Sequence, residues 1–368
     1  MPKIKRSFTN KHNLPQILAD AVMNDKYDSG KSDISVTSLI DSPRVVMLNK
    51  RYQAEIETDV TDLFASAMGT AFHHFMELSD ETCRRKIKIL DAVHVMKNIL
   101  YEINQSNDFK DRDKVIELAT KLEQFYNEQY PEFAEDIIVE VRNYIEINGW
   151  VLSGQFDRLK VLERDDDGNI TKAKLSDYKQ VTTFAYKNPS DIEKWTKQQN
   201  IYRYMLMKLY GIEVVELEIL MVFRDWSKSQ AKIKGAAYPR TWGDSIILPL
   251  IPYEEIEAYL EQRIKLHQTA SQLSEEEFEA KVKCSKKDVW LRDESYAVKK
   301  EGGSRAVTGG VFATLKDAEN FIRQNQSAVK EKLVIEHRAG IPVRCVEYCA
   351  VSKWCKQYQA VAHKYENK

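Results

Sequence analysis

Two aspartates and one lysine lie where a hairpin would bring them together. Residues 150–162 and 170–181 alternate apolar and polar positions, and Asp166-Asp167-Gly168 between them is typical of a hairpin turn with a left-handed glycine. If the turn is centred on Asp167, Asp157 and Asp177 oppose each other, and Lys179 follows on the same face of the second strand. The opposite face is expected to be exposed, since it carries Lys172, Lys174, Ser176 and Gln180.

This arrangement suggests metal-assisted chemistry on a phosphate. Two carboxylates directly opposite each other repel, and burying them without partners costs more. A Mg²⁺ or Mn²⁺ ion would relieve both problems, because these ions prefer a few carboxylate oxygens plus water. Lys179 would then steady an attacking water or the charge that builds on a phosphate. Alternation alone leaves open a surface hairpin in which Lys179 simply neutralises one aspartate.

The segments around this hairpin predict a mixed α/β fold, with a central mixed sheet flanked by helices. Strands are expected at four alternating stretches, residues 137–147, 150–162, 170–181 and 214–226. Helical spacing is found at residues 58–78, 191–209 and 253–273, and in two or three segments between 84 and 130. A short helix capped by Ser35 or Thr37 is expected to run through Leu39, with Pro43 in its first turns or at its end.

The chain divides by pattern into three parts. Residues 1–33 form a polar arm, residues 34–280 a core with a helical N-terminal part, and residues 281–368 a small hairpin-helix element followed by a cysteine-containing segment. The 55 basic and 56 acidic residues leave a net charge of −1, which excludes a histone-like nucleic-acid coat but not a local basic groove. No apolar stretch is long enough to span a membrane and no secretory signal is present, so a cytoplasmic protein without a membrane partner is expected.

Three short motifs resemble those of a known family. Gly154-x-x-Asp157 followed by Ser176-Asp177-Tyr178-Lys179 resembles the core motif of the PD-(D/E)XK nuclease superfamily, which implies a restriction-endonuclease-like core. Two further motifs are similar to those of its RecB-type exonuclease branch, which includes CRISPR-adaptation nucleases. They are the helix Gly69-x-x-x-His73-x-x-x-Glu77 and the helix Gln198-x-x-x-Tyr202.

The resemblance implies roles for the motif residues. His73, Asp157, Asp177 and the carbonyl of Tyr178 would hold Mg²⁺ or Mn²⁺, and Glu77 would support the metal or Lys179. Gln198 and Tyr202, one helical turn apart, would touch the scissile phosphate or orient Lys179. The alternative for this pair is an ordinary amphipathic helix with Tyr202 in the core. Cations near this helix, such as Lys197 and Lys208, would suit phosphate binding, and Trp195, Tyr204 and Trp226 would stack bases or belong to the core.

Three of the five cysteines, Cys345, Cys349 and Cys355, fall within eleven residues of a polar stretch. Several RecB-type nucleases resemble this pattern and close a [4Fe-4S] cluster with such a trio and one distant cysteine, often in a Cys-Pro-Arg context. Here that place reads Ser42-Pro43-Arg44, so Cys284 is the expected fourth ligand and Cys83 the second choice. The spacing also allows Zn²⁺, and it does not decide between the two.

These observations predict a divalent-metal-dependent deoxyribonuclease. Resemblance favours an exonuclease acting in recombination, repair or DNA-end processing, in a bacterium or a phage-infected cell. The alternative is a nuclease-fold subunit that binds DNA or a partner without cleaving, which the intact Asp157, Asp177 and Lys179 disfavour. No Walker-type phosphate-binding motif occurs, so a helicase or recombination partner would be a separate chain.

Overall fold

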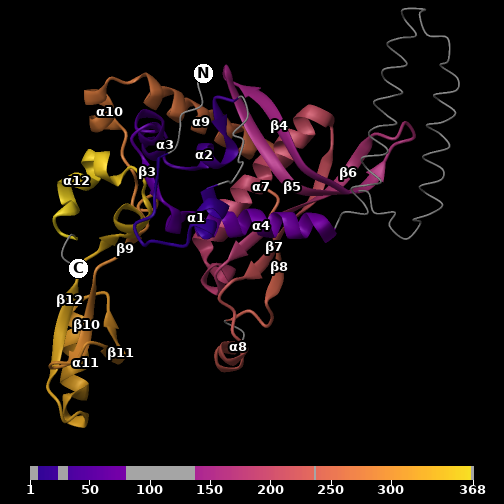
Figure 1. Ribbon diagram of the computed structural model, residues 1–368. Coiled ribbons are helices and arrows are strands. Elements are labelled where there is room, and N and C mark those ends of the chain that lie inside the picture. Colours follow the sequence, from indigo (N-terminus) through magenta and orange to yellow (C-terminus); the bar gives the residue numbers. More distant parts are fainter. Residues whose placement is uncertain (1–6, 24–31, 80–136, 236–237, 366–368) are drawn as a thin grey trace, which may run out of the picture. The chain divides into compact units, whose positions relative to one another are not determined.

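The computed structural model describes residues 7–23, 32–79, 137–235 and 238–365 (Figure 1). The helices expected between residues 84 and 130, and Cys83, lie outside the described residues, as does the side chain of Glu77. Packing divides the chain into two compact units. The sheet unit comprises Phe8–Ile40 and Asp59–Lys265, and the C-terminal unit comprises Met1–Ser7, Asp41–Thr58 and Leu266–Lys368.

A mixed six-stranded sheet organises the sheet unit. Its order is β2-β5-β6-β7-β8, with β4 also paired to β5. The β2/β5 and β6/β7 pairs are parallel, and the β4/β5, β5/β6 and β7/β8 pairs are antiparallel. The strands are β2 (Ile34–Ser35), β4 (Ile137–Ile147), β5 (Trp150–Arg164), β6 (Ile170–Val181), β7 (Glu213–Phe223) and β8 (Gly243–Leu248). All four predicted strands are present, whereas the sequence pattern did not indicate β2 and β8.

The hairpin register follows the sequence prediction. Arg158 pairs with Ser176 and Leu159 with Leu175, so the next position along the ladder sets Asp157 opposite Asp177. Gly168 in the turn has φ +84°, the left-handed conformation that glycine adopts without steric cost. The other face of the hairpin is not exposed throughout, contrary to the expectation from alternation. Ser176 is fully buried there and donates a hydrogen bond to Glu218, its register partner on the neighbouring strand β7.

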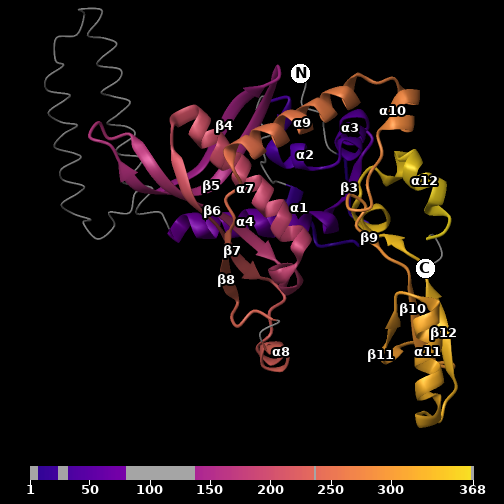
Figure 2. The same cartoon turned by 180° about the vertical axis from the view of Figure 1, so that it is seen from behind.

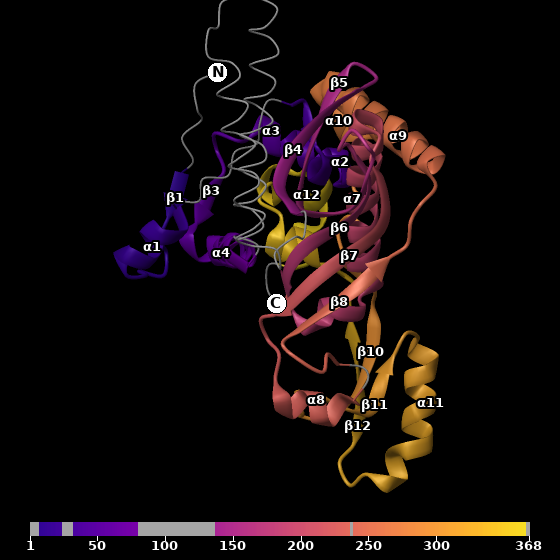
Figure 3. The ribbon, with the colours of Figure 1, turned by 90° about the vertical axis from the view of Figure 1, so that its right-hand side faces the viewer.

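Helices flank the sheet on both faces. Figures 1 and 2 show α4 (Phe64–Ser79) in front of the strands in one view and α7 (Pro189–Tyr210) in front of them from behind. Figure 3 shows the same two helices on either side of the sheet edge. The core of the sheet unit contains fully buried aliphatic side chains together with aromatic ones, with Leu152, Leu159, Leu175, Ile201, Leu217 and Ile219 among the aliphatic members. The fold class predicted from the sequence, a mixed α/β sheet flanked by helices, is confirmed.

Two predicted helices differ in detail. The helix expected over residues 58–78 begins only at Phe64, after strand β3 (Glu57–Asp59) and the 3-10 turn η1 (Val60–Leu63). Asp59 causes the delay, since its buried carboxylate accepts hydrogen bonds from the backbone of Thr61 and Lys11 and so favours a turn. Pro43 does not belong to the short helix α2 (Val36–Ile40). It opens a new one, α3 (Pro43–Arg51), at the first position, where its missing N–H is harmless.

The C-terminal unit contains the predicted hairpin and helix, β10 (Ser295–Lys300), β11 (Ala306–Phe312) and α11 (Leu315–Asn325). A strand that was not predicted, β12 (Leu333–Arg338), completes a sheet of order β11-β10-β12. The remaining elements of the described residues are β1 (Ser7–Thr9), α1 (Gln16–Met23), η3 (Thr183–Lys187), α8 (Lys228–Lys234), α9 (Tyr253–Gln272), α10 (Glu275–Lys281), β9 (Leu291–Arg292), η5 (Gln326–Ala328), β13 (Ile341–Pro342), η6 (Arg344–Tyr348), η7 (Ser352–Trp354) and α12 (Lys356–Ala362). The division into units places the boundary near residue 265 and groups residues 41–58 with the C-terminal segment, whereas the sequence pattern suggested a boundary at 280.

Candidate metal and catalytic site

Neighbouring strands β5 and β6 hold the two aspartates in fixed positions. The backbone N–H of Tyr178 donates a 2.7 Å hydrogen bond to Asp157 Oδ2, so one strand orients the carboxylate of the other. Gln199 on α7 donates through Nε2 to Asp177 Oδ1 at 2.9 Å, and Lys179 forms an ion pair with Asp177 Oδ2. Both aspartates are buried. Strand pairing, a helix side chain and one ammonium group therefore set the geometry of two carboxylates.

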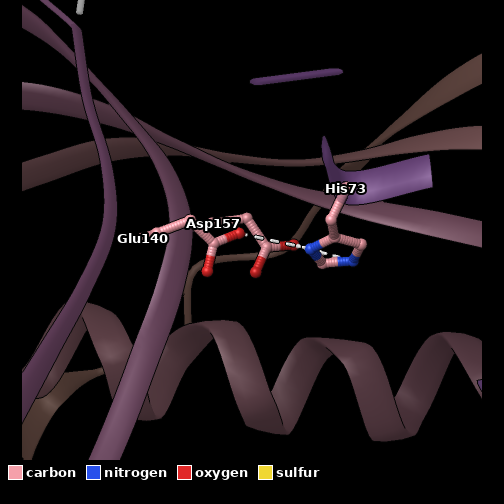
Figure 4. A group of neighbouring side chains, drawn as sticks. All are labelled: His73, Glu140 and Asp157. Carbon is pink, nitrogen blue, oxygen red and sulfur yellow. Dashed lines mark hydrogen bonds and ion pairs between the residues drawn. The ribbon is translucent and has the colours of Figure 1, made fainter. Parts of the chain in front are cut away.

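A second group of side chains converges on Asp157 from other elements. His73 on α4 lies with Nδ1 3.3 Å from Glu140 Oε1 and with Nε2 3.8 Å from Asp157 Oδ2. One ligand atom from each of these three residues lies within 4.8 Å of the others. Figure 4 shows the imidazole and the two carboxylates pointing toward one another.

Glu140 reaches this cluster through a local break in its strand. The ladder between β4 and β5 pairs Val139 with Arg158 and Val141 with Phe156, and skips Glu140, which would face Asp157. Glu140 has φ +54°, a left-handed conformation that costs a residue with a side chain about 1–3 kcal/mol. Gln155 donates a hydrogen bond to Glu140 Oε2 and holds it there. Such strain is common at functional sites, where the surrounding structure maintains it.

The buried charges shift one another's pKa. Burial, together with the nearby charge of Asp177, raises the pKa of Asp157 to about 7. Burial would lower the pKa of Lys179, but the attraction of Asp177 and Asp157 outweighs it and the pKa is raised. For His73, too, burial would lower the pKa, but the hydrogen bond to Glu140 and the charge of Asp157 outweigh it, and the pKa is raised. The raised pKa values of all three groups reflect the gathering of the carboxylates Asp157, Asp177 and Glu140 at one place.

The residues present fit a divalent cation. One imidazole and two carboxylates suit Mn²⁺ well and Mg²⁺ acceptably, and a cation would remove the penalty that raises the pKa of Asp157. Of the ligands expected from the sequence, the structure brings His73 and Asp157 together. Asp177 is engaged by Lys179 and Gln199, and Tyr178 supports Asp157 through its N–H. Coordination by Asp177 and by the Tyr178 carbonyl stays a prediction.

The two motif residues of α7 pair with each other. Gln198 Nε2 donates to the hydroxyl of Tyr202 at 2.9 Å, and both side chains are buried. The Tyr202 ring lies so close over Gly154 that a Cβ there would come within 2.7 Å of its Cε1 atom. The glycine of one motif therefore makes room for the tyrosine of another. The expected contact of Gln198 and Tyr202 with a phosphate or with Lys179 remains a prediction.

Sequence reasoning missed Glu140 and Gln199. Glu140 occupies an alternating stretch with other acidic residues, and nothing in that pattern signals a left-handed residue. Gln199 directly follows the motif glutamine Gln198. Because successive residues of a helix are rotated by about 100°, the sequence already indicated that Gln199 faces a different direction from Gln198.

The four expected cysteines converge in the C-terminal unit. Cys284, Cys345, Cys349 and Cys355 line one pocket together with Arg44 and Arg344. The hydroxyl of Ser42 lies 3.3 Å from Cys284 Sγ, so the cysteine expected as the fourth ligand adjoins the serine of the Ser42-Pro43-Arg44 sequence. Burial raises the pKa of Cys284 to about 11 and that of Cys345 to about 12. Arg44, itself fully buried, donates to Cys355 Sγ at 3.1 Å.

The pocket places the four thiols beside two positively charged side chains. The two arginines supply positive charge beside thiols that must lose their protons to bind a metal.

A mixed sheet that carries paired carboxylates and a lysine on adjacent strands is the framework of a metal-dependent nuclease. The comparison with known families agrees. The PD-(D/E)XK nuclease superfamily matches residues 43–356, and the chain belongs to this superfamily, whose members are typically metal-dependent nucleases that act on DNA. No curated protein matches the chain. Within the described residues, no helix combines the length and apolar character needed to cross a membrane.

Proposed function

We propose that the protein is a divalent-metal-dependent deoxyribonuclease that hydrolyses phosphodiester bonds. The observation that carries this proposal is the assembly of Asp157, Asp177 and Lys179 on paired strands, next to the His73–Glu140–Asp157 cluster. Two buried carboxylates beside a half-buried lysine are costly for folding, and a purely structural sheet would be more stable without them.

Each residue has a distinct part in this proposal. His73, Glu140 and Asp157 would hold the cation, which supplies charge to the phosphate and makes a water more acidic. Lys179 stays protonated beside Asp177 and can donate a hydrogen bond to a phosphate oxygen or to the attacking water. Gln199 keeps the Asp177 carboxylate turned toward Lys179. Gln198 and Tyr202 would touch the scissile phosphate or orient Lys179.

The finer assignment rests on the RecB-type motifs. They favour an exonuclease that processes DNA ends in recombination or repair, fed by a helicase or recombination protein on another chain. A phage or bacterial cytoplasmic setting belongs to the same proposal. The non-cleaving alternative would predict loss of at least one of Asp157, Asp177 and Lys179, and all three are present.

A cleavage assay tests the proposal. End-labelled single- and double-stranded DNA, RNA and a closed circular DNA are incubated with Mg²⁺, Mn²⁺ or EDTA. We expect metal-dependent shortening of linear DNA, with the circle resistant. Asp177→Asn and Lys179→Ala should each lose about 100-fold or more in rate. Lys172→Ala is the matched control, because Lys172 lies on the same strand and pairs with Glu163 outside the site.

Full activity of Lys179→Ala would remove the assigned site. Absence of cleavage by the unmodified protein with either metal would favour the non-cleaving alternative. Cutting of the circle would make the enzyme an endonuclease.

We also propose that Cys284, Cys345, Cys349 and Cys355 hold a [4Fe-4S] cluster with a structural role. The shared pocket and its two arginines support a bound metal group at this place, and the resemblance to RecB-type nucleases favours the cluster over Zn²⁺. Anaerobic purification tests it by absorbance near 400 nm and about four irons per chain. A colourless protein with stoichiometric zinc would identify a zinc site instead, and neither metal would dismiss both.

A further inference from the structure

Exposed apolar side chains gather where the chain leaves β6 and β7. We call the residues concerned the β7–β8 arm, meaning η3 together with residues 224–235 and 238–242. Phe184 and Ile233 are each 76% exposed and Trp242 is 57% exposed. These side chains belong to two connections, β6–α7 and β7–β8, which the hydrogen bonds from Thr183 to Asp225 join. Large apolar side chains so exposed suggest an interaction surface.

The same arm carries concentrated positive charge. Arg224, Lys228, Lys232, Lys234 and Arg240 are all exposed. Within the described part of the chain, none of these five forms an ion pair with a carboxylate. Asp225 and Asp244, the acidic residues of the region, are engaged by hydrogen bonds from Thr183 and Tyr186. In a protein of net charge −1, this is a local excess of cations.

The cations and aromatic residues that the sequence suggested for phosphate and base contacts are used differently. Lys197 pairs with Glu193 at 2.7 Å and Lys208 with Glu257 at 3.0 Å. Trp195 and Tyr204 are buried in the core. Of the suggested aromatic residues only Trp226 belongs to the arm, where it supports Trp242.

The aromatic surface of the arm is held rigidly. The Trp242 and Trp226 rings lie with centroids 5.5 Å apart, and Trp226 Nε1 donates to the Pro239 carbonyl at 2.9 Å. The backbone N–H of Phe223 donates to the Trp242 carbonyl at 2.9 Å, which ties Trp242 to the end of β7. A large ring that is fixed in place and still half exposed loses little entropy when it binds a flat partner.

Strand register places the arm beside the catalytic lysine. Lys179 on β6 is level with Met221 on β7, and Val181 is level with Phe223. Trp242 adjoins Phe223 on the far side of β7. Two strand spacings and two residues along the strands separate Lys179 from Trp242, a backbone distance of about 12 Å. A few nucleotides of one strand span this distance.

We propose that the β7–β8 arm binds single-stranded DNA next to the cleavage site, with bases stacked on Trp242 and Phe184 and phosphates on the arm's cations. This inference rests on the proposed nuclease function. Single-stranded DNA is the occupant that matches both features, because a duplex hides the faces of its bases while a single strand offers them together with phosphates.

Binding measured without cleavage tests the proposal. The protein is titrated against a fluorescein-labelled single strand of 20 nucleotides in EDTA, at several salt concentrations, with anisotropy as the readout. Trp242→Ala should weaken binding at least about fivefold, and Trp242→Phe should restore most of it. Lys232→Gln with Lys234→Gln should lower the slope of log affinity against log salt by about 1.4.

Matched controls lie elsewhere on the sheet unit. Tyr144→Ala removes an aromatic side chain that is 41% exposed, and Lys11→Gln with Lys265→Gln removes two exposed cations. Both controls should bind like the unmodified protein.

Unchanged binding by both Trp242→Ala and the double lysine variant would overturn the proposal. Equal weakening of duplex binding by Trp242→Ala would assign the arm to duplex DNA instead. Because the assay contains no metal, its outcome is independent of whether the protein cleaves.

Discussion

At the scale of single residues, Asp157 makes the metal-free site sensitive to pH. Its pKa is about 7 in the folded protein, against 3.8 for an ordinary aspartate, because of burial and the neighbouring Asp177. Because the folded protein binds this proton more tightly than the unfolded chain does, protonation of Asp157 favours folding. The stabilisation by the bound proton is complete below about pH 4 and is lost as the pH rises through 7. The carboxylate therefore destabilises the empty site at neutral pH.

We expect Asp157→Asn to have a higher free energy of unfolding than the unmodified protein in EDTA. The difference between the two proteins should grow by about 2 kcal/mol between pH 5 and pH 8. Urea denaturation at the two pH values measures this difference. Asp167→Asn, at the exposed hairpin turn, is the control and should show no such trend. An advantage that does not change with pH would contradict the assigned environment of Asp157.

His73 allows a second test at this scale, through metal binding. A cation that binds only the folded state raises its stability with concentration. We expect Mn²⁺ to raise the melting temperature of the unmodified protein and of His74→Ala, whose exposed ring lies outside the cluster, but much less that of His73→Ala. Equal shifts for both histidine variants would remove His73 from the ligands.

At the scale of elements, the β5–β6 hairpin was readable from the sequence because two independent signals agreed. Alternation indicated which residues share a face, and the turn around Asp167 indicated the register, so these two patterns were enough to pair Asp157 with Asp177. Glu140 could not be placed in this way, since its left-handed backbone follows from long-range contacts with Gln155 and His73. Asp59 likewise replaced the first turn of a predicted helix by a side-chain cap that depends on Lys11.

Contact between motifs gives a prediction for Gly154. A Cβ at this position would approach Tyr202 to 2.7 Å and Val36 to 3.0 Å, in a fully buried layer. We expect Gly154→Ala to destabilise the protein by about 1–3 kcal/mol, as overpacking does. Gly69→Ala is the control, because Gly69 lies in helix α4 with open space at its Cβ position and should gain up to about 1 kcal/mol. Denaturation midpoints of the two variants should shift in opposite directions, and a neutral Gly154→Ala would contradict the packing described.

At the scale of the whole molecule, segments that are distant in the sequence pack together. Residues 41–58 lie between segments of the sheet unit in sequence, yet α3 packs its apolar side chains against α10 and the C-terminal residues around Val351 and Cys355. Periodicity could not reveal this, because a periodic pattern shows that a helix has an apolar face but not what covers it. For the cysteines it was the family resemblance that pointed across the chain, since it implied that a distant cysteine, Cys284, joins the C-terminal trio, and the four line one pocket.

The neighbourhood of Ser42 and Cys284 gives the last prediction, which rests on the proposed cluster. Ser42 Oγ and Cys284 Sγ lie 3.3 Å apart, so a thiol at either position starts from nearly the same place. We expect Cys284→Ser to lose most of its iron and absorbance near 400 nm, and the double variant Ser42→Cys with Cys284→Ser to regain them. Ser352→Cys with Cys284→Ser is the control, since Ser352 also lines the pocket but is held beside Cys349, whose carbonyl accepts its backbone N–H, and this variant should stay colourless. Full iron content in Cys284→Ser alone would show that Cys284 is not a ligand. Loss of iron without rescue by Ser42→Cys would show that only a thiol at position 284 can complete the ligand set.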